Sequence, residues 1–120
     1  MRTDVGRDPI VNINGVLRVL NRGEVGPLHG VVRLEDVSAI DAPARVLATA
    51  PVVLAGGETE MRFQLVVDRP PDAAGAYLLS ARLEGEDLRT RRRRIFGTST
   101  AHPWRVENRG DAVIELDPWT

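Results

Sequence analysis

The stretch Glu60-Met-Arg-Phe-Gln-Leu-Val-Val-Asp68 decides the fold of this chain. Its apolar side chains at Met61, Phe63, Leu65 and Val67 occupy every second position. Alternation with a period of two is typical of a β-strand that turns one face to the core and the other to solvent. The segment is therefore predicted to be a half-buried strand.

The same alternation recurs on both sides of this strand, and no helical period is sustained. Glycine and proline turns separate the alternating segments. Strands are predicted over residues 10–20, 30–37, 45–54, 60–68 and 76–84, from near Leu88, briefly within 103–107, and over 111–116. Seven or eight short strands at this spacing indicate an all-β fold, and specifically an antiparallel β-sandwich.

A chain of 120 residues is long enough for one domain with an ordinary hydrophobic core. We place a single β-sandwich domain at residues 9–117 and expect residues 1–8 to form a disordered N-terminus. Gly15 is expected at a β-bulge or a close crossing of strands. The hydroxyl of Tyr77 is expected to bond a neighbouring backbone group, as in the tyrosine corner of sandwich domains.

The composition excludes several kinds of chemistry. The absence of cysteine rules out disulfides, thiolate metal sites and thiol catalysis. The two histidines, His29 and His102, are far apart and have no carboxylate at a metal-ligand spacing, so we expect no metal site and no cofactor. A net charge of −1 argues against general binding of polyanions, although positive charge can still be concentrated locally.

The chain has no apolar run long enough to span a bilayer, so membrane insertion is not expected. Its first eight residues carry charges with no hydrophobic region behind them, which is unlike a secretory signal. The chain as it stands is expected in the cytoplasm. It is expected in the periplasm if an upstream signal has been removed.

Three segments resemble one bacterial family. They are Val32–Leu47, which reads as a strand, a polar turn and the start of a second strand, then Met61–Leu65, and then Tyr77–Leu83 with its Tyr-x-Leu-x-Ala-Arg pattern. Their order and spacing are similar to those of the YbaY-like and YscW-type lipoproteins, over about residues 12–116. This resemblance implies a small immunoglobulin-like or transthyretin-like β-sandwich, usually tethered to a membrane by a lipid. It also implies a pilotin role, in which the protein assists assembly of an outer-membrane secretin, although the lipid-bearing cysteine of the family is missing here.

The run Arg89-Thr-Arg-Arg-Arg-Arg94 is the largest local charge. If it forms a strand, Arg89, Arg91 and Arg93 share one face. Unpaired arginines are too costly to bury, so we predict an edge strand or a protruding hairpin. Its function would be contact with an anionic group or an acidic partner, and the alternative is that the charges only protect a sheet edge from aggregation.

A second candidate is the cluster His102-Pro-Trp-Arg105. Trp104 and Arg105 are residue types enriched at protein-binding hot spots, and His102 with Trp104 are candidates to line a small-ligand pocket. The structural alternative is that Trp104 covers one end of the core. Trp119, among the last residues, is expected to be exposed or at an interface.

No motif indicates catalysis. None of the serines lies in a Gly-x-Ser-x-Gly elbow, and no glycine-rich phosphate loop is present. The oxygen-bearing side chains of Asp36, Ser38 and Asp41 are expected to bond their own turn rather than hold calcium.

We therefore expect a non-enzymatic accessory module that binds a protein partner. The candidate contacts are Arg89, Arg91, Arg93, Trp104 and Arg105. The alternatives are a small-ligand-binding protein or small enzyme with a pocket at His102 and Trp104, and, less favoured, nucleic-acid binding by the arginine run, which lacks interleaved aromatic residues. Pairing of two copies through an edge strand would give a homodimer.

Overall fold

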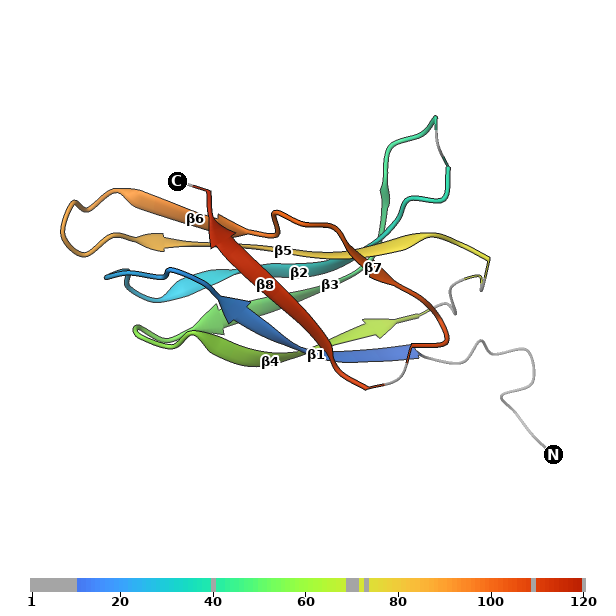
Figure 1. The fold of residues 1–120 in the computed structure, drawn as a ribbon, viewed down its shortest axis with the longest axis horizontal. Helices are drawn as coiled ribbons and strands as arrows, with labels where there is room; N and C mark the ends of the chain where they lie inside the picture. The colour runs from blue at the N-terminus through green and yellow to red at the C-terminus, as the bar shows by residue number, and fades with distance from the viewer. Residues whose placement is uncertain (1–10, 40, 69–71, 73, 109, 120) are drawn as a thin grey trace.

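The chain folds into eight β-strands in the computed structural model, which describes residues 11–39, 41–68, 72, 74–108 and 110–119 (Figure 1). The strands are β1 (Val11–Val19), β2 (Leu28–Asp36), β3 (Arg45–Leu54), β4 (Glu60–Val67), β5 (Tyr77–Glu86), β6 (Arg93–Gly97), β7 (His102–Trp104) and β8 (Ala112–Pro118). They pair in the order β3-β2-β5-β6-β8-β1-β4, and β7 pairs separately with β5. The prediction of an all-β fold with seven or eight strands is confirmed.

The prediction of a purely antiparallel sandwich is wrong, because β1 and β8 run parallel to each other. A parallel pair needs a long crossover, and here the six intervening strands provide it. Strands β6 and β8 pair only at Phe96 with Pro118 and at Gly97 with Asp117. This short pairing joins the group β4-β1-β8 to the group β3-β2-β5-β6, so the result is one mixed sheet nearly closed into a barrel-like shape.

The predicted faces of the two clearest strands are confirmed. In β4, Phe63, Leu65 and Val67 are buried, whereas the side chains between them are exposed. In β5, Tyr77, Leu79, Ala81 and Leu83 are buried. The same alternation places the inward side chains of β1, β2 and β8 in one continuous core. Burial of these apolar surfaces is the main stabilising contribution to the fold.

Two glycines lie where strands approach too closely for a side chain. A Cβ at Gly15 would meet the ring of Phe63 and the carbonyl oxygen of Ala112, so the predicted close crossing is confirmed. The register of β1 with β4 is continuous there, and no bulge is needed. A Cβ at Gly30 would meet the carbonyl oxygen of Arg82 on the paired strand β5.

Both ends of the sheet differ in part from prediction. The sixth strand begins at Arg93 rather than near Leu88, because Leu88–Arg92 form the turn. The last strand continues to Pro118, and Trp119 donates its backbone N–H to the carbonyl of Ile95 at 2.7 Å. Trp119 lies against Gly97 and is half exposed, as predicted for an exposed residue. The expected disorder of residues 1–8 concerns a segment outside the described residues.

Arg22 is a buried arginine that the sequence did not indicate, and only 5% of its surface is exposed. Its guanidinium donates hydrogen bonds to four backbone carbonyls: Glu58 at 2.7 Å, Gly26 at 2.7 Å, Val25 at 3.2 Å and Ala55 at 3.2 Å. Two of these carbonyls belong to the β1–β2 connection and two to the β3–β4 turn. A single side chain therefore ties two separate loops together.

Candidate functional site

The arginine run forms the end of the β5–β6 hairpin. Leu88–Arg92 form the turn, and Arg91 has a φ of 64°. Only Arg93 and Arg94 belong to a strand. The prediction of a protruding hairpin is confirmed. The prediction that strand alternation places Arg89, Arg91 and Arg93 on one face is wrong, because the first two lie in the turn.

Asp87 holds this turn in shape. Its carboxylate accepts hydrogen bonds from the backbone N–H groups of Arg89 at 2.8 Å and Thr90 at 3.0 Å. Its backbone N–H donates to the carbonyl of Arg92 at 2.8 Å. The hydrogen bond from Thr90, followed by that from Arg89, lowers the pKa of the Asp87 carboxyl below its usual range. The turn therefore presents its arginines on an ordered backbone.

Part of the positive charge is neutralised within the hairpin. The guanidinium of Arg91 lies 3.0 Å from the carboxylate of Glu86, and that of Arg93 lies 3.5 Å from the carboxylate of Glu84. Arg94 lies 3.5 Å from Asp87, and its guanidinium is over the Phe96 ring at 5.4 Å.

Two arginines of the turn keep their charge available. Arg89 and Arg92 are exposed and form no ion pair with the residues that the structure describes. Leu88 beside them is 53% exposed. The tip of the hairpin therefore combines an apolar side chain with two free guanidinium groups, which suits contact with an acidic surface.

Trp104 is a core residue at the other end of β5. It is 7% exposed, and its ring meets that of Tyr77 edge-on with the centroids 6.2 Å apart. The Tyr77 hydroxyl donates to the carbonyl of Asp72 at 3.0 Å, which confirms the predicted bond to a neighbouring backbone group. Burial raises the pKa of the Tyr77 hydroxyl. The structure thus supports the alternative in which Trp104 covers the end of the core.

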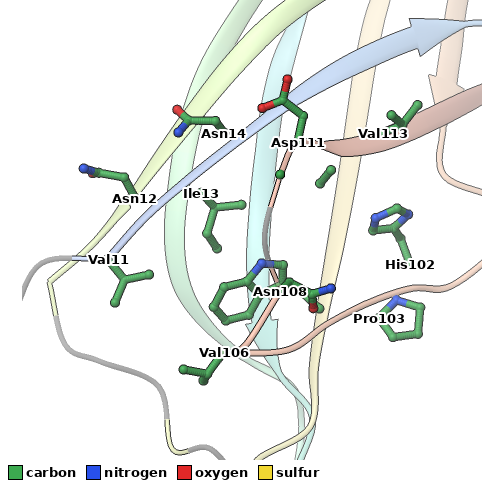
Figure 2. Close-up of a pocket in the computed structure, with 13 residues that line it drawn as sticks. Val11, Asn12, Ile13, Asn14, His102, Pro103, Val106, Asn108, Asp111 and Val113 are labelled. Carbon is green, nitrogen blue, oxygen red and sulfur yellow. The ribbon is translucent and has the colours of Figure 1, made fainter.

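A groove of about 540 Å³ opens between β1, β7 and the start of β8, and both His102 and Trp104 line it (Figure 2). Its further lining includes Ile13, Val106 and Asp111. The volume lies in the range of small-molecule sites. Arg105 is exposed and pairs loosely with Glu107 at 3.7 Å.

The two candidate surfaces lie apart. Trp104 pairs with Tyr77 at the start of β5, and Arg93 pairs with Glu86 at its end. Nine residue steps along a strand correspond to about 30 Å. Figure 1 shows β7 and the β5–β6 turn toward opposite ends of the molecule. The arginine hairpin and the Trp104 region therefore do not form one contact surface.

Polar residues of the groove were not among the site residues predicted from the sequence. Asn12 and Asn14 come from β1, and Asp111 precedes β8. Asp111 forms an ion pair with Arg62 at 2.7 Å, and Asn14 accepts a hydrogen bond from Gln64 at 3.1 Å. Their alternation along β1 was visible in the sequence. Their position beside β7 depends on a long-range arrangement that no local pattern reports.

The turn after β2 has a structural role. The Asp36 carboxylate accepts the backbone N–H of Ser38 at 2.9 Å, and the Ser38 hydroxyl accepts the N–H of Ala76 at 2.8 Å. The expected bonding of this turn to its own backbone is thus confirmed at Asp36. Within the described part of the chain, no group of three or more side chains is placed to hold a metal ion. The same residues contain no helix of the length and apolarity that crossing a membrane requires.

The comparisons agree with the resemblance drawn from the strand segments. Residues 10–116 match the family described as "Type III secretion system lipoprotein chaperone (YscW)". A solved structure, that of an alternative pilotin from the type II secretion system of Vibrio cholerae, is similar with a TM-score of 0.69 and 26% sequence identity. That likeness covers 93% of this chain and 99% of the pilotin chain. The comparison with curated proteins gives no match. The chain therefore belongs to the YscW family of type III secretion system lipoprotein chaperones.

Proposed function

We propose that this protein is a pilotin-like accessory of a secretion system, that its partner is an outer-membrane secretin, and that it acts on the periplasmic side of that membrane. The family match over residues 10–116 carries this proposal. The similarity to a type II secretion pilotin supports it. Chaperones of this kind act by binding another protein, so the surface that makes the contact is the functional site.

The proposed contact is the tip of the β5–β6 hairpin. The segment from Glu84 to Arg94 holds five arginines against three carboxylates, which leaves an excess of two positive charges. Three of the arginines are paired within the hairpin, and Arg89 and Arg92 remain for a partner. Exposed charges of this kind chiefly accelerate association with a surface of opposite sign. The partner surface is accordingly proposed to be acidic.

The test is capture of a secretin from a detergent-solubilised envelope extract by immobilised protein, with identification by mass spectrometry. Charge reversal at Arg91 and Arg93 would place new carboxylates beside Glu86 and Glu84 and disturb the hairpin itself. The sharper variant is Arg89→Glu with Arg92→Glu, which leaves those pairs intact. Its control is the equally charged double variant Arg33→Glu with Arg82→Glu, at two exposed arginines of β2 and β5 that form no ion pair with the described residues.

We expect the double variant to reduce secretin capture about tenfold, which corresponds to about 1.4 kcal/mol. The control is expected to capture the secretin as the unchanged protein does. Failure to capture a secretin would contradict the proposed partner. Equal capture by the double variant would contradict the proposed surface. Dimer formation through an edge strand stays a prediction, and sedimentation measurements test it.

Binding of a small ligand is a second candidate function, because the groove is reached by both His102 and Trp104. A thermal-shift screen with a His102→Ala control tests it. Stabilisation that persists in the His102→Ala variant would place the ligand elsewhere.

A further inference from the structure

The groove beside β7 is bordered by an unpaired strand edge. Strand β8 pairs with β1 from Gly15, opposite Ala112, to Val19, opposite Leu116. Residues 11–14 of β1 pair with β4 on their other side. On the β8 side, these four residues have no strand neighbour among the described residues. The place beside them is the groove itself (Figure 2).

The backbone hydrogen bonds at the end of β1 show which groups face this place. Val19 donates its N–H to the carbonyl of Thr59, just ahead of β4, at 2.8 Å. Leu20 donates to the carbonyl of Leu116 in β8 at 2.9 Å. Successive residues of a strand present their backbone groups to opposite sides, and the register with β4 is continuous from Val11 to Arg18. The N–H and C=O groups of the even-numbered residues, Asn12 and Asn14 among them, therefore face the groove.

The opposite wall is less suited to pairing. Strand β7 uses one edge to pair with β5, at Tyr77 with Trp104 and at Leu79 with His102. The residue between them is Pro103, which has no N–H to donate. Proline on a free edge discourages the addition of a strand. An added strand would therefore pair with β1.

The lining of the groove fits an uncharged extended segment. Ile13, Trp104 and Val106 supply apolar surface that can receive alternate side chains of a strand. The carboxylate in the lining, Asp111, is already paired with Arg62 at 2.7 Å. The other strand edges are protected differently, since β3 carries Pro51 and β4 carries the exposed Glu60 and Arg62.

We propose that this groove is a strand-addition site, in which an extended, uncharged segment of a partner protein pairs with the backbone of Asn12 and Asn14. The added strand takes the position beside β1 that β8 leaves open ahead of Gly15. Main-chain hydrogen bonds hold it, and apolar side chains enter the groove next to Trp104. The site lies at the opposite end of β5 from the arginine hairpin and is independent of the contact proposed there.

The probe is the blocked, uncharged peptide Gln-Thr-Val-Thr-Val-Thr-Gln, added at up to millimolar concentration to the full ¹⁵N-labelled chain. Amide hydrogen exchange by NMR reports which backbone groups it covers. The key variant is Asn12→Pro, which removes a groove-facing N–H and leaves the β1–β4 ladder intact. Its matched control is Asn12→Ala, which changes the same side chain and keeps the N–H.

Saturation with peptide is expected to slow exchange of the Asn12 and Asn14 amides about tenfold or more. Asn12→Pro is expected to weaken peptide binding about fivefold to tenfold, the effect of one hydrogen bond, and Asn12→Ala to change it less than about twofold. If Asn12→Pro does not fold, peptides N-methylated at alternate residues replace it. Methylation on one set of alternate residues should then abolish binding, and methylation on the other set should not.

Three results would overturn the inference: no peptide binding, binding without protection at Asn12 and Asn14, or equal affinity for the Asn12→Pro and Asn12→Ala proteins. The Arg89→Glu, Arg92→Glu protein is expected to bind the peptide normally. Its loss of secretin capture together with retained peptide binding separates the two sites. Failure of the peptide alone leaves the secretin proposal standing.

Discussion

Replacement of the buried Arg22 should destabilise the protein more than that of any exposed arginine. Its guanidinium donates at 2.7 Å to the carbonyls of Glu58 and Gly26 and makes two longer bonds at 3.2 Å. Hydrogen bonds from a charged donor contribute about 1.5–3 kcal/mol each. If only the two short bonds are counted, Arg22→Ala should lower the free energy of unfolding by about 3–6 kcal/mol. That is a large fraction of the 5–15 kcal/mol typical of a domain.

The assay is equilibrium unfolding in urea followed by circular dichroism. The matched control is Arg18→Ala, whose exposed guanidinium lies 2.9 Å from Glu60 at the surface. Surface pairs contribute about 0–1 kcal/mol, so this control should change stability by less than about 1 kcal/mol. Arg22→Lys should recover only part of the loss, because one ammonium group cannot reach both loops. A cost for Arg22→Ala no larger than that for Arg18→Ala would refute the view that Arg22 ties the loops together.

Two further measurements test other parts of the structure. Tyr77→Phe removes the hydroxyl that donates to Asp72 and keeps the ring against Trp104, so urea unfolding should show a loss of about 1 kcal/mol, and an unchanged midpoint would contradict the bond. Asp87 has a lowered pKa in the folded state, so its contribution to the hairpin turn is present above the unfolded value of about 3.9 and is lost as the pH falls through the folded value. The Thr90 amide resonance should therefore titrate with a midpoint below about 3.9 and lose this transition in Asp87→Asn, whereas a midpoint at or above that value would disprove the assignment.

The two proposed contacts lie at opposite ends of strand β5. At the end of β5, an ordered turn presents free guanidinium groups, and their interaction with a partner depends on charge. At its start, the groove presents backbone groups of β1 and apolar side chains. Charge contacts weaken with salt, whereas main-chain pairing in a groove is much less sensitive. Salt dependence therefore distinguishes the two contacts within one complex.

The sequence by itself determined the strands and the faces they bury. The alternation of apolar and polar residues in 60–68 and 76–84 is a local pattern. It predicted the inward side chains of β4 and β5 because each strand turns one face to solvent and the other to the core. The turn-bonding role of Asp36 and the exposure of the arginine run also follow from local chemistry, since unpaired charge stays in water. The three family-like segments were local patterns as well, and the match over residues 10–116 confirms them.

The tertiary structure decided what depends on residues far apart in the chain. The parallel pairing of β1 with β8 joins the two ends of the sequence, and neither strand's own pattern specifies its neighbour or its direction. The groove lies where β8 has not yet begun to pair with β1, since that pairing starts at Gly15 and no other described strand pairs with Asn12 and Asn14 on that side. In the sequence, Arg22 is one more arginine in a turn. Only the folded chain brings the carbonyl groups of the β3–β4 turn within hydrogen-bond distance of its guanidinium. Strand alternation is a property of neighbouring residues, whereas strand edges, grooves and the partners of a buried charged side chain arise only when distant segments meet.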